Sequence, residues 1–428
     1  MNFPASITSS RTLYHQVCAL LVYQSVFEHP LGEAFIALLK VLQHRDGEQS
    51  QKGTDCLSHY SRWFRLLAAS QTSWQDFLLS RVLEDENPFS LLAQSQNLAS
   101  LPPTLVRAAG HDLSILQSIY YCTLTQIIQW VGIASQSLAE VIAWEIPNKS
   151  LSVFDLQQDW AQQLPQLCQH YRERGVGQFA RFQVLHWQGR RLEGVATPDS
   201  VKLEDLVGYD EPKQALLRNT EALLRGYPAL HVLLYGCRGS GKSSLVKALA
   251  PHYGPRGLRL IEVDQNQLQE LPQIFELLRH RPQKFVLFVD DLSFEDDDRR
   301  FKSLKRVLEG GVTARPTNVV IYATSNRRHL VREFWGDRPQ YPQTEEIQSW
   351  DTVQEKLSFA DRFGLTLTFT PADQTTYLKI VHHLAQRAGL NLPTEELEFQ
   401  AKQWAVRHNG RSGRTARQCV DYLQANLS

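Results

Sequence analysis

A glycine-rich segment in the second half of the chain has the residue types and the spacing of a phosphate-binding loop. Residues 236–243 have the sequence Gly-Cys-Arg-Gly-Ser-Gly-Lys-Ser and match the pattern G-x-x-x-x-G-K-[ST] in full. Glycines let the backbone turn so that several N–H groups converge on an anion. The lysine brings a flexible positive charge to the phosphates, and the serine after it offers a hydroxyl to Mg²⁺. We therefore predict a nucleotide site formed by Gly236, Gly239, Ser240, Gly241, Lys242, Ser243 and Ser244.

The segments on either side of this loop support the prediction. The apolar run LHVLLY precedes the loop and is typical of a buried strand, whereas SSLVKALAPHY follows it and has the pattern of a helix. A helix that begins at the loop directs the positive end of its dipole at bound phosphates.

A second apolar run ends in acidic residues that are suited to hold the metal. KFVLFVDDLSFEDDD places Asp290 and Asp291 at the end of a predicted strand. In phosphoryl-transfer sites of this kind, a carboxylate at the strand end binds Mg²⁺. We assign that role to Asp290 and predict that Asp291 activates the attacking water. Glu295 is the alternative for the second role, and support of the metal from a distance is the alternative role for Asp291.

A third apolar run, NVVIYATSN, ends in Asn326. An amide at this position is placed to orient the attacking water or to contact the terminal phosphate. Another strand-like segment, LRLIEVD, lies between the first two motifs, and this insertion separates the ASCE class of P-loop proteins from the Ras-like class. The chain has no N-K-x-D sequence for guanine recognition, so that ATP is favoured over GTP.

The elements that must position these residues divide the chain into four predicted parts. Residues 1–175 carry apolar side chains at three- and four-residue spacing and predict a helical N-terminal domain. Residues 176–200 alternate apolar and polar side chains around a Gln-Gly turn and predict a β-hairpin that serves as a linker. Short apolar runs that alternate with helical segments predict an α/β P-loop core with a parallel sheet over residues 201–370. Three helical segments predict a lid over residues 371–428.

The second half of the chain also resembles a known class of ATPases. As a set, its motifs resemble an AAA+ module, which is a P-loop core followed by a helical lid. More narrowly, the segments LVGYDEPKQALLRNT, FVDDLSFEDDD, NVVIYATSNRRHL, SFADRFGL and SGRTARQ resemble a bacterial family of ATP-binding proteins known only as a domain of unknown function. The resemblance implies an ATPase that uses ATP and Mg²⁺.

The resemblance implies further site residues. Gly208 and Tyr209 lie in the segment that flanks the adenine in AAA+ proteins, and Asn326 corresponds to the sensor-1 position. Arg362 stands where the arginine finger precedes the last core strand. Such a guanidinium offsets the charge that develops during phosphoryl transfer. If the finger acts on a neighbouring subunit, the protein forms a head-to-tail homo-oligomer, either a ring or an open spiral.

Two more positions complete the comparison with AAA+ proteins. Arg414 fits the sensor-2 position on the lid, with Arg417 as the alternative. For Arg362 and Arg414 alike, a surface salt bridge is the competing interpretation. Asp291 departs from the family pattern, because such ATPases usually carry a glutamate there. Aspartate is one methylene shorter, so slow hydrolysis is an open alternative.

Composition and charge are those of an ordinary globular protein. The 428 residues are 43% hydrophobic and 21% charged, and 45 basic side chains balance 45 acidic ones. The six cysteines lie singly, which argues against a zinc site or a disulfide framework and favours a reducing compartment. The N-terminus lacks a secretory pattern, and the apolar stretch 126–144 is interrupted by polar residues, which predicts a packed helix and not a membrane span. We therefore expect a cytoplasmic protein with no membrane partner.

Three hypotheses describe the work that ATP drives. The first is remodelling of an unknown protein or nucleoprotein client, with residues 1–175 as an adaptor. The second is threading of a polypeptide, which is disfavoured because VDQNQLQELPQIF, after the second core strand, lacks an aromatic–Gly pair. The third is a nucleotide-gated interaction module or a DNA-associated loader with slow or no turnover. Basic clusters at residues 299–306 and 327–328 are candidates for nucleic-acid phosphates, although solvated surface is the commoner role of such clusters.

Overall fold

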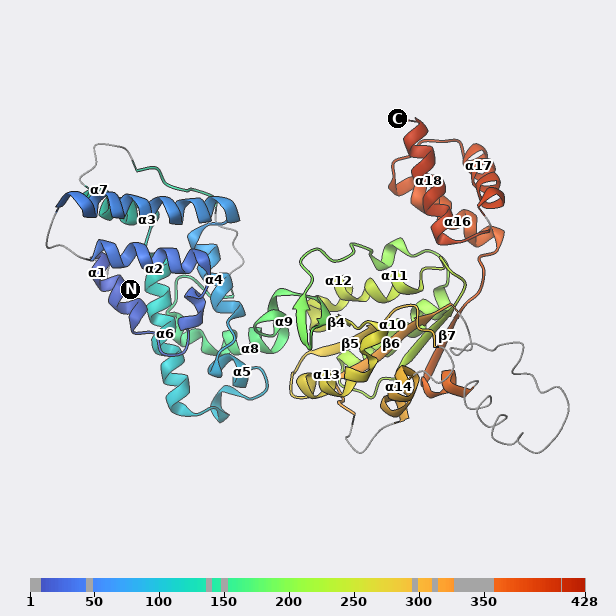
Figure 1. Cartoon of the computed structure of the whole chain (residues 1–428), viewed down its shortest axis with the longest axis horizontal. Helices are drawn as coiled ribbons and strands as arrows, with labels where there is room; N and C mark the ends of the chain where they lie inside the picture. The colour runs from blue at the N-terminus through green and yellow to red at the C-terminus, as the bar shows by residue number, and fades with distance from the viewer. Residues whose placement is uncertain are drawn as a thin grey trace. The chain divides into compact units, whose positions relative to one another are not determined.

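The structure, a computed structural model, describes residues 9–43, 49–135, 141–147, 153–294, 299–309, 315–326, 358–408 and 410–427. The chain divides into two units, Met1–Arg181 and Phe182–Ser428 (Figure 1). The division falls inside the segment 176–200 that the sequence predicts as a hairpin linker. Residues 176–181 belong to the first unit, whereas the observed hairpin strands, Val184–Gln188 and Arg191–Gly194, belong to the second.

In the described residues of the first unit, all regular secondary structure is helical. Its α-helices are α1 (Ser10–Cys18), α2 (Pro30–Leu42), α3 (Gln49–Ser70), α4 (Trp74–Glu84), α5 (Pro88–Ala93), α6 (Pro103–Tyr121), α7 (Leu124–Ser135), α8 (Leu164–Arg174) and α9 (Gln178–Arg181). Short 3₁₀ turns lie at η1 (Gln24–Phe27), η2 (Leu98–Ser100) and η3 (Trp160–Gln163). Several helices begin at capping side chains. Ser73 accepts the Asp76 amide N–H at 3.0 Å, and Asn87 and Ser90 form a reciprocal cap at the start of α5.

Aromatic side chains fill the core of this unit. The ring centroids of Phe35 and Trp74 lie 4.1 Å apart, and Trp63 meets Trp74 edge to face at 5.6 Å. Phe154 stacks on Trp160 at 4.6 Å. These three tryptophans are almost fully buried, so they serve packing and not an exposed aromatic surface.

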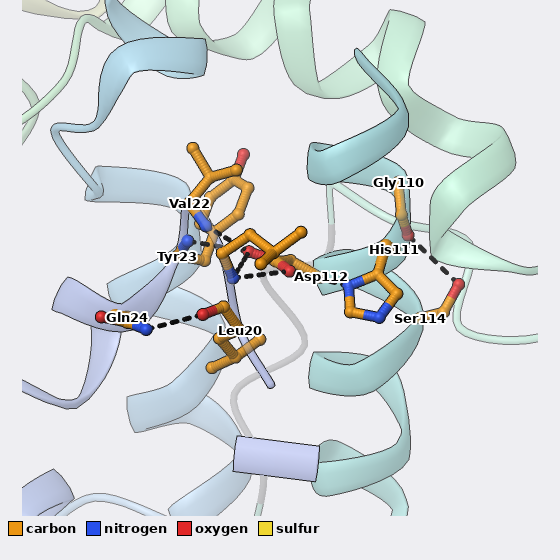
Figure 2. Close-up of polar contacts among 9 residues, drawn as sticks. Leu20, Val22, Tyr23, Gln24, Gly110, His111, Asp112 and Ser114 are labelled. Carbon is orange, nitrogen blue, oxygen red and sulfur yellow. Dashed lines mark hydrogen bonds and ion pairs between the residues drawn. The ribbon is translucent and has the colours of Figure 1, made fainter. Parts of the chain in front are cut away.

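A buried carboxylate fixes the turn between α1 and η1. Asp112 of α6 is fully buried, and its Oδ2 accepts three consecutive amide N–H groups, from Leu21 at 2.9 Å, Val22 at 2.7 Å and Tyr23 at 3.0 Å (Figure 2). His111 Nδ1 lies 3.1 Å from the other oxygen. Burial of a charge is costly unless hydrogen bonds replace water, and the three amides supply that replacement.

The predicted helix over residues 126–144 is only partly correct. Helix α7 ends at Ser135, residues 136–140 lie outside the described residues, and 141–147 are not helical. The Trp144 indole N–H instead donates to the Thr72 carbonyl at 3.3 Å, which ties this non-helical segment to the end of α3. In the part of the chain that the structure describes, every helix is too short or too polar to cross a membrane.

The second unit contains a seven-stranded sheet in the order β2-β1-β4-β5-β6-β3-β7. All neighbouring strands are parallel except β1 and β2. The strands are β1 (Val184–Gln188), β2 (Arg191–Gly194), β3 (Val232–Gly236), β4 (Leu258–Glu262), β5 (Lys284–Val289), β6 (Val319–Ser325) and β7 (Leu365–Phe369). Every residue of β6 is buried, as expected for a central strand that is covered on both faces.

Helices cover the two faces of this sheet (Figure 1). Helices α10 (Asp210–Leu224), α11 (Lys242–Lys247) and α12 (Leu249–Tyr253) share one hydrophobic core with alternate residues of the strands. Helices α13 (Leu271–Leu278) and α14 (Arg299–Glu309) lie on the other side (Figure 1). This distribution follows from right-handed crossovers between parallel strands. The 3₁₀ turns are η4 (Leu203–Asp205), η5 (Gly254–Arg256), η6 (Gln265–Glu270) and η8 (Ser358–Arg362).

The predicted hairpin is present, but it extends the sheet and does not form a separate linker. Gly189 and Arg190 both adopt positive φ, at 58° and 62°, as the tight turn of a two-residue hairpin requires. Strand β1 then pairs in parallel with β4, with Leu185 opposite Ile261. The sequence could not reveal this pairing because a hairpin motif does not specify its third neighbour.

Three helices form the C-terminal lid: α16 (Gln374–Arg387), α17 (Thr394–Arg407) and α18 (Gly413–Leu427). They share a core of their own, which includes Tyr377, Val381, Ala401 and Val420. All three helices lie within residues 371–428, where the sequence predicts three helical segments.

Candidate nucleotide site

The register of the sheet brings the three predicted motifs to one edge. Tyr235 at the end of β3 pairs with Ser325 of β6, and Val289 at the end of β5 pairs with Ala323. The residues that follow these strands therefore emerge side by side. Ligands of open α/β sheets bind at this carboxyl edge. A cleft of about 740 Å³ lies there and is lined by residues of the core and of the lid.

Glycine is required at two points of the loop between β3 and α11. Gly236 has φ 142°, and a Cβ atom there would lie 2.0 Å from the Phe369 carbonyl oxygen. Gly239 has φ 76°, and a Cβ atom would lie 2.9 Å from Ser412 Oγ and 3.0 Å from Arg414 Cβ. The loop is thus held between the end of β7 and the start of the lid helix α18. Ser240 closes it from within, since its hydroxyl donates to the Cys237 carbonyl at 2.9 Å.

Lys242 begins α11 and turns its side chain back over the loop. Its Nζ donates to the carbonyl oxygens of Gly236 at 2.9 Å and Cys237 at 2.8 Å, and to Asn326 Oδ1 at 3.3 Å. Burial lowers the pKa of this ammonium group, and the nearby Cys237, Asp291 and Asp290 oppose the shift. The ammonium group therefore lies between the backbone of the loop and the residues at the acidic strand end.

Asp290 is the hub of the predicted metal site. Its Oδ1 accepts the Ser243 hydroxyl at 2.6 Å and the Thr324 hydroxyl at 2.5 Å. The amide N–H of Asp291 approaches the same oxygen at 3.1 Å. The carboxylate and hydroxyl of the two predicted metal residues are thus in direct contact at the cleft. Oxygen atoms of this kind are the ligands that Mg²⁺ prefers.

Asp291 adopts a backbone conformation that is unusual for a residue with a side chain. Its φ is 51°, in the left-handed region. Three contacts hold this turn: its amide N–H donates to Thr324 Oγ1 at 2.9 Å, and Gln265 Nε2 donates to the carbonyls of Asp290 at 3.1 Å and Asp291 at 2.5 Å. Strained residues of this type concentrate at functional sites. The strain here aims the carboxylate at Asn326, whose Nδ2 donates to Asp291 Oδ1.

Asn326 therefore links the two groups on either side of it. Its amide oxygen accepts the ammonium of Lys242 at 3.3 Å, while its amide nitrogen donates to Asp291. This pair of contacts fixes the orientation of the amide, because only its oxygen can accept and only its nitrogen can donate. Lys242, Asn326 and Asp291 thus form a continuous chain of hydrogen bonds at the cleft.

The other end of the cleft is largely apolar. Gly208 and Tyr209 line it, together with Leu206, Ile380 and Leu384. The Tyr209 hydroxyl donates to the Thr370 carbonyl at 2.9 Å, and its ring lies 5.2 Å from that of Phe369. Burial raises the pKa of Tyr209, and Cys237 and Asp373 add to the effect. A flat, apolar base fits this end, opposite the charged end that is suited to phosphates.

Of the basic residues that the sequence assigns to the site, three line the cleft and one does not. Arg414 and Arg417 line it alongside Lys242, and the Arg414 backbone N–H donates to the Gly239 carbonyl at 3.3 Å. Arg362 is not among the residues that line the cleft. It ends η8, just before β7 begins at Leu365, and its guanidinium pairs with Glu309.

The sheet explains why Arg362 is remote from the cleft in its own subunit. Strand β7 runs parallel to β3, with Leu365 opposite Val232 and Phe369 opposite Gly236. Arg362 therefore lies at the amino edge of the sheet, whereas the phosphate loop lies at the carboxyl edge. Five residues at about 3.3 Å each separate the two edges by roughly 17 Å.

Two residues of the site were not predicted from the sequence. Thr324 precedes the strand end and binds both aspartates, and Gln265 lies after β4 and binds their backbone. A threonine in a run of buried apolar residues, NVVIYATSN, was an available signal for the first. For Gln265 the sequence held no signal, since η6 reaches the site only through the pairing of β4 with β5.

Some predicted alternatives cannot be placed. Glu295, the alternative to Asp291, and the basic pair Arg327–Arg328 lie outside the described residues. Of the basic cluster on α14, Arg300 donates to Asn266 Oδ1 at 3.0 Å and so contacts η6. Among the described residues, no group of three His, Cys, Asp or Glu side chains is arranged to hold a metal ion.

The architecture is that of a P-loop AAA+ fold. The phosphate loop joins β3 to α11, β4 is inserted between β3 and β5 in the chain, and a helical lid follows the last strand. The helical first unit precedes this module, as the sequence predicts.

Comparisons with known proteins give weak similarity to several curated proteins and solved structures. A chloroplastic ATP-dependent Clp protease ATP-binding subunit ClpA homolog of Brassica napus is 24% identical over 270 residues, which are 51% of this chain and 31% of that protein. The replication factor C large subunit of Staphylothermus marinus is 33% identical over 86 residues, which are 20% of each chain. The match thus spans less than a third of either relative. The solved RuvB Holliday junction branch migration motor of Thermotoga maritima has a TM-score of 0.36 and 17% identity, over 52% of this chain and 63% of that one.

The family comparison covers more of the chain. The family described as "Protein of unknown function (DUF815)" matches residues 177–427, more than half of the 428 residues. The matched region begins near the start of the second unit and includes the hairpin, the P-loop core and the lid. The chain therefore belongs to the DUF815 family of proteins of unknown function.

Proposed function

We propose that the protein binds ATP with Mg²⁺ at the carboxyl edge of its sheet and hydrolyses it. The observation that supports this most directly is the contact between the phosphate loop and the acidic strand end, where Ser243 Oγ lies 2.6 Å from Asp290 Oδ1. This contact joins two segments that are distant in sequence, and it brings together a hydroxyl and a carboxylate, which are oxygen groups of the kind that Mg²⁺ prefers. The name of the Brassica napus relative, an ATP-binding subunit, supports the same nucleotide.

Each residue has a role that follows from its position. The loop N–H groups and Lys242 bind the phosphates, and Ser243 and Asp290 hold Mg²⁺, which neutralises the charge that develops on the phosphate oxygens when it is bound. Asp291 orients and deprotonates the attacking water. Asn326 sets the direction of that carboxylate through its Nδ2 contact.

The lid and the base-binding segment complete the proposed site. Gly208 and Tyr209 contact the adenine at the apolar end of the cleft, and Arg414, or Arg417, approaches the phosphates from the lid. The pocket thus takes its phosphate contacts from both the core and the lid.

The position of Arg362 supports a homo-oligomer. Because the sheet separates this guanidinium from the phosphate loop of its own subunit, it can act as an arginine finger only on the nucleotide of a neighbouring copy. A head-to-tail arrangement of this kind closes into a ring or continues as a spiral. We propose that such an assembly remodels a protein or nucleoprotein client in the cytoplasm, with the helical first unit as its adaptor.

A second candidate function is a nucleotide-gated interaction module or DNA-associated loader with slow or no turnover. Two properties of Asp291 support this function. Its side chain is one methylene shorter than that of glutamate, and its carboxylate already accepts a hydrogen bond from Asn326. A carboxylate held in this way must break that contact before it can engage a water molecule.

Two variants separate these possibilities. Calorimetry with ATP and Mg²⁺ should detect binding to the wild type and none to Lys242→Ala, because the variant loses the main phosphate charge. Asp291→Asn should bind ATP normally but hydrolyse it at least about 10-fold more slowly, as removal of a general base typically does. If the wild type binds no adenine nucleotide, the proposed function is wrong. If it binds ATP without turnover, the second candidate is correct.

A further inference from the structure

The lid contacts the core at both ends of the cleft. At the phosphate end, the start of α18 touches the loop, where the Arg414 N–H donates to Gly239 O. At the base end, the segment from Asp205 to Gly208 meets α16. A Cβ atom at Gly208 would lie 2.8 Å from Thr376 Cγ2 of the lid, so the two elements are in direct contact there.

Two successive residues of this segment pack against different hydrophobic cores, one in the P-loop core and one in the lid. Leu206 packs against the core beneath α10 and α11, whereas Val207, the next residue, packs against the lid core. An outward rotation of the lid must therefore withdraw Val207 from its apolar contacts. The base end of the cleft is the junction at which the closure of the lid is determined.

An ion pair crosses this junction. The carboxylate of Asp205 pairs with Arg387, the last residue of α16, and its second oxygen accepts the Lys202 N–H at 3.0 Å. The Asp205 side chain is only 12% exposed, against 46% for Arg387. Burial alone would raise the pKa of Asp205, but the bonds from Arg387 and Lys202 outweigh it and lower the pKa. Among the ion pairs of the described residues, this pair is the one that joins core to lid.

We propose that the Asp205–Arg387 pair is a latch that keeps the lid closed over the base end of the cleft and sets the rate at which nucleotide leaves. The inference rests on the proposed nucleotide binding. Asp205 itself lines the cleft beside the apolar residues that would contact the base, so that opening of the latch exposes this end of the pocket. Arg387, the partner of Asp205 on the lid, is not among the residues that line the cleft.

Release of the fluorescent nucleotide mant-ADP, followed by stopped flow after excess unlabelled ADP is added, tests the latch without the complication of hydrolysis. Asp205→Asn and Arg387→Gln remove one charge each and retain most of the side-chain volume. We expect release from each variant to be roughly 5- to 10-fold faster than from the wild type. The Asp205 carboxylate is largely buried, so this pair should contribute more than a fully exposed ion pair does. Lys402→Ala, which breaks an exposed pair with Glu398 inside α17, should leave the rate unchanged.

The double variant distinguishes a pair from two separate effects. If the two charges act on each other, Asp205→Asn with Arg387→Gln should release mant-ADP no faster than the faster single variant, because the interaction has already been lost. Wild-type release rates in both single variants, or rates that multiply in the double variant, would overturn the latch. The wild-type trace reports separately on the proposed function, since a protein that binds no mant-ADP gives no signal at all.

Discussion

Thr324 offers the sharpest test of the metal site, because the structure assigns it two contacts and the sequence motifs assign it none. Its hydroxyl donates to Asp290 Oδ1 and accepts the Asp291 N–H at 2.9 Å. Thr324→Val retains the shape of the side chain and removes both contacts. A hydrogen bond to a charged group contributes about 1.5–3 kcal/mol, which corresponds to roughly 10- to 150-fold in an equilibrium constant at about 1.4 kcal/mol per factor of ten.

The lower part of that range is expected here. Asp290 retains its contacts with Ser243 and with the Asp291 N–H, so its orientation is weakened and not lost. Removal of residues that orient metal ligands typically lowers metal affinity or activity 10- to 100-fold. We therefore expect the Mg²⁺ concentration for half-maximal ATPase activity to rise about 10- to 30-fold in Thr324→Val.

A Mg²⁺ titration of ATP hydrolysis at saturating ATP measures this shift. Thr366→Val is the matched control, since Thr366 is an exposed residue of β7 and its loss should not change the Mg²⁺ dependence. Circular dichroism would verify that both variants are folded. If Thr324→Val and the wild type require the same Mg²⁺ concentration and turn over ATP equally fast, then Asp290 does not depend on this hydroxyl and our account of the metal site is wrong.

Three further predictions address the loop, the assembly and the sheet. Cys237 and Cys18 are exposed while the other four cysteines are not. ATP with Mg²⁺ should therefore slow maleimide labelling of Cys237 at least about 10-fold and leave Cys18 unaffected, and equal labelling with and without nucleotide, read by peptide mass spectrometry, would contradict binding at the loop. If Arg362 acts on a neighbouring subunit, a mixture of inactive Arg362→Ala and inactive Lys242→Ala should regain ATPase activity, whereas a mixture that remains inactive argues against a shared site. Burial lowers the pKa of His231 to about 3, with Arg315 contributing. Between about pH 6.5 and pH 3, the imidazole therefore binds a proton only in the unfolded state. Relative to His231→Asn, the free energy of unfolding measured in urea should fall by about 1.4 kcal/mol between pH 7.5 and 5.5. An identical pH dependence in the two proteins would show that His231 is not buried in its neutral form.

The phosphate loop and the strands were predictable because their signals are local. A buried parallel strand is a short apolar run, and the loop needs glycines at fixed offsets from one lysine. The same holds for the lid helices, whose bounds depend on apolar periodicity. Capping groups such as Asp373, which accepts the Thr376 N–H at 2.7 Å at the start of α16, mark these bounds in the sequence itself.

Features that depend on contacts distant in sequence were not predictable in the same way. The parallel pairing of β1 with β4 joins the hairpin to the sheet. Nothing in the hairpin sequence indicates that β4 is the strand with which β1 pairs. Gln265 reaches the aspartates only because β4 lies beside β5. The positive φ of Asp291 is likewise unexpected, since a residue with a side chain rarely adopts it.

The position of Arg362 shows how topology limits function where a motif alone cannot. Sequence similarity suggests a finger but does not say which nucleotide it serves. The parallel pairing of β7 with β3 places Arg362 and the phosphate loop at opposite edges of one sheet. Each subunit of the proposed assembly would therefore have the proposed phosphate- and metal-binding residues at its own cleft, while Arg362 would be available only to the cleft of a neighbour. Glu309 neutralises that cation in the single chain. Hydrolysis should accordingly depend on protein concentration, because only contact between subunits can exchange Glu309 for a phosphate as the partner of Arg362.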